Sequence, residues 1–171
     1  FVADGQCVLS YPAAGNLDKA RGTIAMWVSP QWDGADGQSH SFFSDDLDFN
    51  QPADNNLHLW KWVSGDSLRF DIRTAEPKDI ESGIAGWKAG EWHHIAVAWD
   101  CQVGTRLFVD GRQVAALSLK WEPKPGTRFY VGANWNGGSP AQALIEDVVI
   151  YDAPLDAGQV ARVATGQALP A

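Results

Sequence analysis

Cysteine, methionine and positive charge are scarce in this sequence, and long apolar runs are missing. Its 171 residues include two Cys and one Met, and 13 Lys and Arg stand against 21 Asp and Glu, which gives a formal net charge of −8. A phosphate backbone would be repelled by such a chain, so nucleic acid is excluded as a partner. The lack of a long apolar run likewise excludes membrane insertion through a spanning helix.

The two cysteines exclude a zinc site of the usual kind. Cys7 and Cys101 lie far apart in the sequence, whereas zinc ligands come in pairs with short spacings. Two alternatives remain open: a single disulfide between them, or two separate buried thiols that act as small hydrophobic side chains.

Short runs rich in β-branched and aromatic residues alternate with Gly, Pro, Asp and Asn clusters along the whole chain. We expect strands at residues 6–11, 23–29, 41–45, 57–63, 67–73, 93–100, 106–111, 112–119, 128–134 and 144–151. The pattern predicts a helix only at residues 156–164, with Asp156 as its N-cap. The pattern predicts an all-β meander that forms one domain over residues 1–171.

Apolar residues alternate within these runs, as they do in strands with one face toward a core. In residues 23–29, for example, Ile24, Met26 and Val28 share one side. Two antiparallel sheets packed face to face would bury all such sides together. The sequence therefore predicts an antiparallel β-sandwich.

Tryptophan is abundant, with nine residues, and two of them share one expected strand. In residues 57–63, LHLWKWV, leucines occupy one side, whereas His58, Trp60 and Trp62 occupy the other. This second side is expected to face away from the core.

The next run continues the same pattern with charged groups. Residues 67–73, SLRFDIR, place Arg69, Asp71 and Arg73 on the side opposite their apolar residues. A tight turn at residues 64–66, SGD, predicts a hairpin in which the two outward sets lie side by side.

An aromatic face flanked by hydrogen-bonding groups matches the chemistry of a sugar ring, which has C–H groups on one side and hydroxyls at its edge. We therefore expect Trp60 and Trp62 to stack on carbohydrate, with the polar side chains of the same face fixing its orientation. Further contacts are expected at the rim from Trp135, Asn134 and Trp32. In the alternative interpretation, a long loop folds over this sheet and buries the indoles as a second small core.

Three motifs in the order seen here resemble those of the laminin G-like, concanavalin A-like jelly-roll family. They are AGEWHHIAVAWD (89–100), GTRLFVDGRQVAALSL (104–119) and RFYVGANWNGGSPAQALIEDVVIYDAPLDAGQVARV (128–163). Residues 16–30 and 3–12 resemble the second and first strands of the family, so the likeness covers nearly the whole chain.

The resemblance implies two curved sheets, with ligands bound on the concave sheet or on rim loops. It also implies a secreted, periplasmic or cell-surface location and attachment to other domains of a larger chain, because many relatives are sugar-binding appendages of polysaccharide-active enzymes. Phe1 is not an initiator Met and no leader precedes it, so we expect a processed or excised fragment.

A structural calcium ion is a further implication of the resemblance. The family often binds it through a carboxylate at the start of the last long strand, together with backbone carbonyls near the first strand. The usual Asp is replaced here by Glu146, which is followed by Asp147. Calcium accepts either carboxylate, so both residues are candidate ligands.

A catalytic function has little support in the sequence. Jelly-roll glucanases carry their acids in an E-x-D-x-E run on one strand, and this chain has no such run. The acidic residues at 45–48 and 76–81 are expected in exposed loops.

The leading interpretation is a non-catalytic carbohydrate-binding module. The alternatives are an adhesion or protein-interaction domain and, third, a glycoside hydrolase or polysaccharide lyase with an unusual arrangement of acids.

Overall fold

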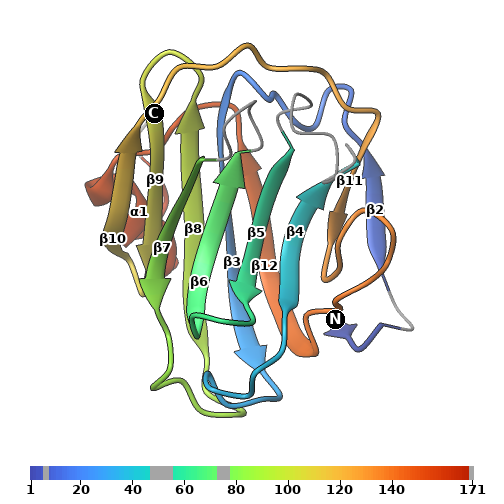
Figure 1. The fold of residues 1–171 in the computed structure, drawn as a ribbon. Helices are drawn as coiled ribbons and strands as arrows, with labels where there is room; N and C mark the ends of the chain where they lie inside the picture. The colour runs from blue at the N-terminus through green and yellow to red at the C-terminus, as the bar shows by residue number, and fades with distance from the viewer. Residues whose placement is uncertain (6–7, 47–55, 73–77, 170–171) are drawn as a thin grey trace.

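The computed structural model describes residues 1–5, 8–46, 56–72 and 78–169, which form two six-stranded antiparallel sheets packed face to face (Figure 1). Sheet A has the strand order β1-β12-β3-β8-β9-β10, and sheet B the order β2-β11-β4-β5-β6-β7. The strands are β1 Val2–Ala3, β2 Leu9–Pro12, β3 Arg21–Pro30, β4 His40–Asp45, β5 Leu57–Trp62, β6 Ser67–Ile72, β7 Lys78–Gly83, β8 His93–Asp100, β9 Gly104–Val109, β10 Arg112–Ser118, β11 Arg128–Val131 and β12 Ala143–Tyr151. The predicted all-β jelly-roll sandwich is confirmed.

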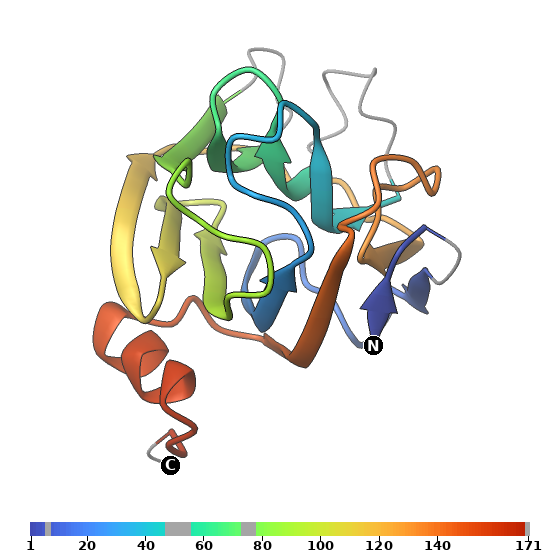
Figure 2. The same cartoon turned by 90° about the horizontal axis from the view of Figure 1, so that it is seen from below.

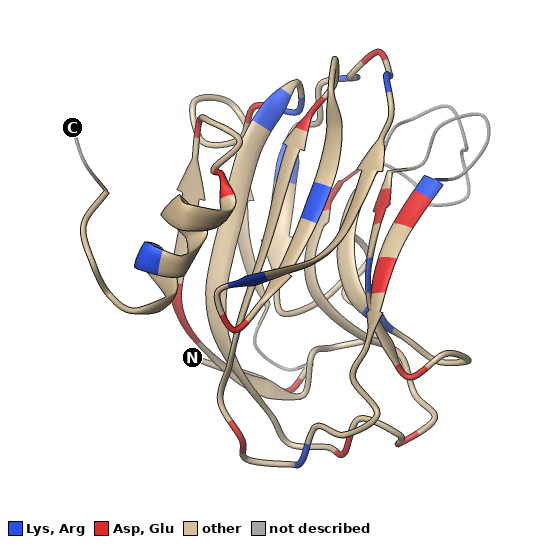
Figure 3. Ribbon diagram, turned by 90° about the vertical axis from the view of Figure 1, so that its left-hand side faces the viewer, with Lys and Arg blue, Asp and Glu red and all other residues tan. Residues whose placement is uncertain are grey.

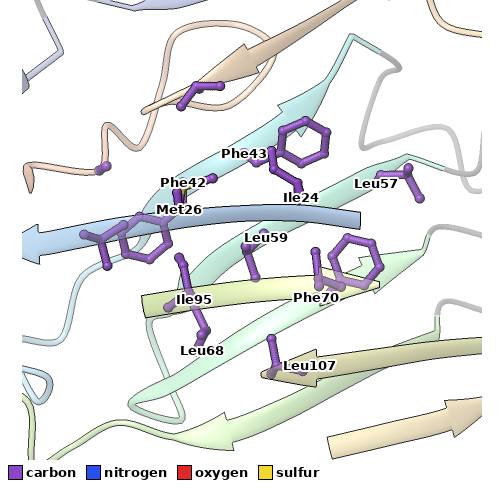
Figure 4. Packing of buried hydrophobic residues seen from close by; sticks show 14 of the residues in the cluster. Ile24, Met26, Phe42, Phe43, Leu57, Leu59, Leu68, Phe70, Ile95 and Leu107 are labelled. Carbon is purple, nitrogen blue, oxygen red and sulfur yellow. The ribbon is translucent and has the colours of Figure 1, made fainter. Parts of the chain in front are cut away.

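The core lies between the inner faces of the two sheets. Leu59 of β5 and Leu68 of β6 point from sheet B toward Met26 and Ile95 of sheet A, and all four side chains are fully buried (Figure 4). These are the apolar positions that the sequence alternation predicts to face inward. Tight packing of both inner faces provides most of the stability of a sandwich of this kind.

Two positions depart from the predicted alternation. Lys61 is the last residue of β5 whose side chain points toward the core. The strand ends at Trp62, so Val63, which the alternation also places on the inward side, lies exposed in the following turn. Val148 is 36% exposed, although the apolar alternation of residues 144–151 places it on the same side as Ile150, toward the core. A bulge between Glu146 and Val149 shifts the alternation of β12 at this point.

Lys61 is fully buried at one end of the core and is neutralised there by an acidic group. Its Nζ lies 2.8 Å from Asp36 Oδ1 and donates to the carbonyl of Gln38 at 2.8 Å. The other Asp36 oxygen lies 2.7 Å from His40 Nε2. This network fastens the loop between β3 and β4 to the interior of the sandwich.

A second buried ion pair lies in the core between Lys19 and Asp45, whose Nζ and Oδ2 are 2.6 Å apart. Asp45 also accepts hydrogen bonds from the Asn56 side chain and the Leu57 backbone. The expectation that Asp45 belongs to an exposed acidic loop is therefore wrong. The carboxylate sits inside strand β4, where it satisfies a buried ammonium group.

The predicted helix forms as α1, Ala157–Ala164, with Asp156 as its N-cap. The Asp156 side chain accepts from the Gln159 backbone, and the Gln159 side chain accepts from the Asp156 backbone, which completes a capping box. The helix lies on the outer face of sheet A, away from sheet B (Figure 3), where Val160 packs in a small cluster with Phe108. No helix in the described part of the chain is long and apolar enough to cross a lipid bilayer.

The two long sides of the sandwich differ. On one side β7 of sheet B contacts β10 of sheet A, so the sheets approach each other. On the other side the edge strands are β2 in sheet B and β1 in sheet A, seen end-on in Figure 2. Because β1 pairs only with Ala143 and Leu144, most of β12 has no second partner strand among the described residues.

Candidate functional site

The outer face of sheet B carries the residues that the sequence singled out, and it faces the viewer in Figure 1. Strands β5 and β6 form the predicted hairpin. Trp60 pairs with Arg69 and His58 pairs with Asp71 across it. The next strand, β7, continues one of these rows, because Glu81 pairs with Arg69. The outward sets therefore lie side by side, as predicted.

Three aromatic rings of β5 are packed in sequence along this face. His58 stacks on Trp60 with ring centroids 4.9 Å apart, and Trp60 meets Trp62 edge-to-face at 5.0 Å. The Trp60 Nε1–H donates to Asp71 Oδ2 at 2.8 Å, and the His58 Nε2 lies 2.9 Å from Ser41 Oγ on β4. The rings and their polar partners thus hold one another in fixed positions.

Burial divides this group into two parts. His58, Trp60 and Asp71 are buried, with exposed fractions of 6%, 7% and 6%. This agrees, for Trp60, with the alternative in which the indoles form a small second core. Trp62 keeps partial exposure, so it is the member of the predicted aromatic pair that solvent reaches. Arg73, the remaining residue of the predicted face, lies outside the described residues.

The exposed end of the face is built around Trp62 and Arg69. The Arg69 guanidinium carbon lies 4.7 Å from the centre of the Trp62 ring. Arg69 Nη2 lies 2.7 Å from Glu81 Oε2, and its Nε lies 3.3 Å from Asp79 Oδ2. The guanidinium is therefore held on the indole by two carboxylates of the neighbouring strand.

Glu81 is kept ionised by these neighbours. Hydrogen bonds from Arg69 and from the Ser67 hydroxyl lower the pKa of the Glu81 carboxyl below its ordinary value. A glycosidase acid needs the opposite change, because it must hold a proton near neutral pH. Glu81 is thus suited to accept hydrogen bonds from hydroxyl groups.

Asp79 and Glu81 were expected in an exposed loop, and that expectation is wrong. Both belong to strand β7, whose only buried apolar residue is Ile80. A strand with so little apolar alternation gives no strand signal in the sequence. The period-two spacing of Asp79 and Glu81, which matches that of Arg69 and Asp71, is the one signal that could have revealed it.

Trp135 and Asn134 lie in the loop between β11 and β12, and both are half-buried. The loop passes beside β4, since the Ser41 backbone N–H donates to the Ser139 carbonyl at 2.8 Å. Asn134 Oδ1 accepts from the Asn136 backbone. The structure therefore brings this loop next to the strand that flanks the aromatic row, at the rim of the same sheet.

Trp32 is not a rim contact. It is 6% exposed, its Nε1–H donates to the Ala141 carbonyl at 2.7 Å, and its ring stacks on His40 with centroids 4.4 Å apart. The loop that carries it folds into the end of the sandwich, where Lys61 fastens it. Trp32 is part of the core, a correction of the sequence-based expectation.

Glu146 and Asp147 lie on β12 and are both exposed. Glu146 pairs with Trp27 in sheet A, so the two acids are far from the aromatic row of sheet B. Among the described residues, no three His, Cys, Asp or Glu side chains cluster in a way that could hold a metal ion. These two carboxylates alone make an incomplete calcium site, and calcium binding stays a prediction.

Cys101 is a free, buried thiol. Its proposed partner, Cys7, lies outside the described residues.

Comparisons with known proteins agree with the β-sandwich fold of this chain. The sequence model of the concanavalin A-like lectin/glucanases superfamily matches residues 4–161. A search of curated protein sequences finds no significant match. Among solved structures, domain 4 of AbnA, a GH43 extracellular arabinanase from Geobacillus stearothermophilus determined in complex with arabinotriose, superposes with a TM-score of 0.76. It is 18% identical, and the match covers 95% of this chain and 75% of that one.

Two further structures share the sandwich at lower identity. A heptameric SAP-like pentraxin from Limulus polyphemus is 18% identical, with a TM-score of 0.62 and coverage of 85% of this chain and 70% of that one. The receptor-binding domain of a botulinum neurotoxin C/D mosaic serotype is 9% identical, with a TM-score of 0.73. That match covers 97% of this chain but 42% of the toxin domain. At these identities the likeness concerns the fold.

Proposed function

The chain belongs to the concanavalin A-like lectin/glucanase superfamily, and from this we propose that it is a non-catalytic carbohydrate-binding domain of a larger secreted or cell-surface protein. Its ligand is a poly- or oligosaccharide that binds on the outer face of sheet B. The observation that carries the proposal is the Trp62–Arg69 pair, a partly exposed indole with a fixed guanidinium beside it.

The pair offers both kinds of contact that a sugar requires. The Trp62 ring provides an apolar surface for the C–H side of a sugar ring, and such stacking contributes about 1 kcal/mol beyond the area that it buries. Arg69 supplies hydrogen-bond donors, and the Glu81 carboxylate beside it supplies acceptors. Both side chains can therefore form hydrogen bonds with the hydroxyls at the edge of the sugar ring.

The support behind the pair is rigid. Trp60 and Trp62 meet edge-to-face, and Trp60 is itself held by its hydrogen bond to Asp71. Arg69 is held by two carboxylates. Side chains that are already fixed lose little conformational entropy when a ligand binds, so the affinity gained from each contact is retained.

The neighbouring structures support a binding role. The arabinanase domain was determined in complex with arabinotriose, and it belongs to an enzyme as one of several domains. The neurotoxin domain is a receptor-binding domain. The arabinanase domain thus shows the same sandwich in a complex with a sugar, and the neurotoxin domain contains the sandwich within a larger receptor-binding domain.

The test is a glycan array followed by titration of the best ligand, with intrinsic tryptophan fluorescence as the readout. Trp62→Ala is expected to weaken binding at least tenfold, which corresponds to about 1.4 kcal/mol. Trp92→Ala is the matched control, because Trp92 is 40% exposed but lies next to sheet A, directly before the first residue of β8. A folded protein that binds no glycan, or that loses binding equally in both variants, would contradict the proposal.

An adhesion or protein-interaction function is the second candidate, and the exposure of Trp92 favours it. A tryptophan 40% exposed to solvent is a typical anchor of a protein interface. If this function is correct, the Trp92→Ala variant should no longer form a complex with an adjoining domain of the parent protein, as measured by size-exclusion chromatography. The wild-type chain should then bind no sugar.

A further inference from the structure

A groove runs along the open side of the sandwich, between the edge strand β2 of sheet B and strand β12 of sheet A. It consists of two adjoining hollows of about 440 Å³ each, which share Gly15, Asn16 and Ile150 as lining residues. Hollows of this size are within the range of small-molecule sites. The groove is separate from the Trp62–Arg69 pair, which lies on the outer face near the opposite edge of sheet B.

One hollow is lined mainly by residues with apolar side chains and contains an exposed aromatic ring. Tyr11 is 44% exposed and stacks on Phe129 with ring centroids 5.5 Å apart and an interplanar angle of 26°. Val131 and Ile150 complete the floor from the two sheets. The supported tyrosine ring resembles the kind of surface on which the C–H side of a sugar packs.

The adjoining hollow contains two carboxylates and an amide side chain among its lining residues. Asn16, Asp18, Tyr151 and Asp152 line it. Asn16 donates through Nδ2 to the Pro12 carbonyl, which leaves its side-chain carbonyl to accept. Asp18 uses Oδ1 to accept from the Ala20 backbone, so a second carboxylate oxygen remains. Neither hollow has a Lys or Arg among its lining residues.

The edges of the groove are poorly suited to a peptide strand. Pro12 has no N–H to donate, and Arg128 Nη2 already donates to the Ser10 carbonyl at 3.1 Å. On the other edge, Asp147 at a φ of 50° lies in the bulge that interrupts β12. An added strand would find its register interrupted at Pro12 on one edge and at the bulge on the other, so side-chain recognition is favoured over β-augmentation.

We propose that this groove is a second carbohydrate site, which takes the end of a neutral oligosaccharide. The inference rests on the proposed function and adds a site and a ligand class to it. The Tyr11 ring packs against the sugar, while Asn16, Asp18 and Asp152 accept hydrogen bonds from its hydroxyls. Because carboxylates line the groove without a compensating cation, acidic sugars such as uronates are repelled.

The test isolates the groove by removing the first site. A Trp62→Ala variant is titrated by calorimetry with a panel of neutral trisaccharides, arabinotriose among them, and with trigalacturonate as an acidic counterpart. We expect one remaining site per chain for a neutral trisaccharide and at least tenfold weaker binding of trigalacturonate. Adding Tyr11→Ala should abolish the remaining binding, whereas adding Tyr11→Phe, which keeps the ring, should change it less than threefold.

The possible failures are distinguishable. If the wild-type chain binds a neutral trisaccharide but Trp62→Ala binds none, the groove inference is overturned and the proposed function stands. Binding that remains in Trp62→Ala and ignores Tyr11→Ala also overturns the inference. If the wild-type chain binds no trisaccharide, the proposed function and the groove inference both fail. Thermal melts of each variant confirm that it is folded, as expected for exposed side chains.

Discussion

Lys61 has a structural role, as a buried charge, that its neighbours in the sequence do not reveal. It lies between two tryptophans and follows the inward side of β5, so its ammonium group ends inside the sandwich. Asp36 and the Gln38 carbonyl satisfy that charge. A buried ammonium without such partners would cost several kcal/mol, so the loop that supplies them is tied to the fold.

Asp36→Ala is therefore expected to destabilise the protein by about 3 kcal/mol, because it removes the carboxylate closest to the fully buried Lys61 and leaves only Asp66, whose Oδ1 lies 3.8 Å from Nζ. Urea unfolding measures this change. Asp33→Ala in the same loop is the control, with an expected loss below about 0.5 kcal/mol, since its contacts with the Lys88 side chain and the Ala89 backbone N–H are both exposed. Equal losses in the two variants would show that Lys61 does not depend on Asp36.

His94 provides a pH-dependent test. Burial lowers the pKa of its imidazole below the ordinary value of 6.5, and the nearby Asp110 only partly opposes this. The unfolded chain then binds a proton more readily than the folded one. The contribution of His94 to the free energy of unfolding is fully present above about pH 6.5. It is lost as the pH falls toward the lower pKa of the folded state.

The free energy of unfolding should thus decrease between pH 7 and pH 5, and His94→Gln should reduce that slope. Urea titrations at half-unit pH intervals provide the comparison. Parallel curves for the wild type and His94→Gln would contradict the assignment of the pH dependence to this residue.

At the scale of elements, sequence patterns predict strands well where apolar residues alternate. Residues 93–100 were predicted and observed as β8 with the same bounds, and the hairpin of β5 and β6 followed from the turn between them. Strand β7 was missed because Ile80 is its only buried apolar residue. The burial of Trp32 was not predictable, because it depends on contacts with distant residues such as Ala141. Burial of the indoles was an open alternative for Trp60, which packs against His58 and Trp62 of its own strand.

The N-terminus of α1 offers a test at this scale. Asp156→Ala removes the side chain that caps the Gln159 backbone N–H, with an expected cost of about 1 kcal/mol. Amide hydrogen exchange should speed up in the first turn of α1 and stay unchanged in β5. Unchanged protection of α1 would show that packing of Val160 against sheet A holds the helix without its cap.

The whole molecule is a sandwich closed on one side by β7 and β10 and open on the other, with a helix on the outer face of sheet A. Its net charge of −8 favours neutral or basic ligands over acidic ones. The sheet B face and the open groove lie on different surfaces, so a long polysaccharide or two separate chains would be able to occupy both, which raises the overall avidity.

The predicted calcium binding can be tested on the whole molecule, because a ligand that binds only the folded state raises its stability. If Glu146 and Asp147 complete a site with backbone carbonyls, the melting temperature should rise with millimolar calcium and fall with chelator. Glu146→Gln should remove the difference. A melting temperature that is the same under both conditions would exclude a structural calcium ion.

The most direct test of the central claim is NMR of the indole N–H groups during titration with a neutral oligosaccharide selected on the glycan array. The nine tryptophans give nine indole signals when each is resolved, and single substitutions assign them. We predict a saturable shift of the Trp62 signal and a constant Trp92 signal. Saturable binding that leaves Trp62 unmoved would contradict the assignment of sugar recognition to the outer face of sheet B.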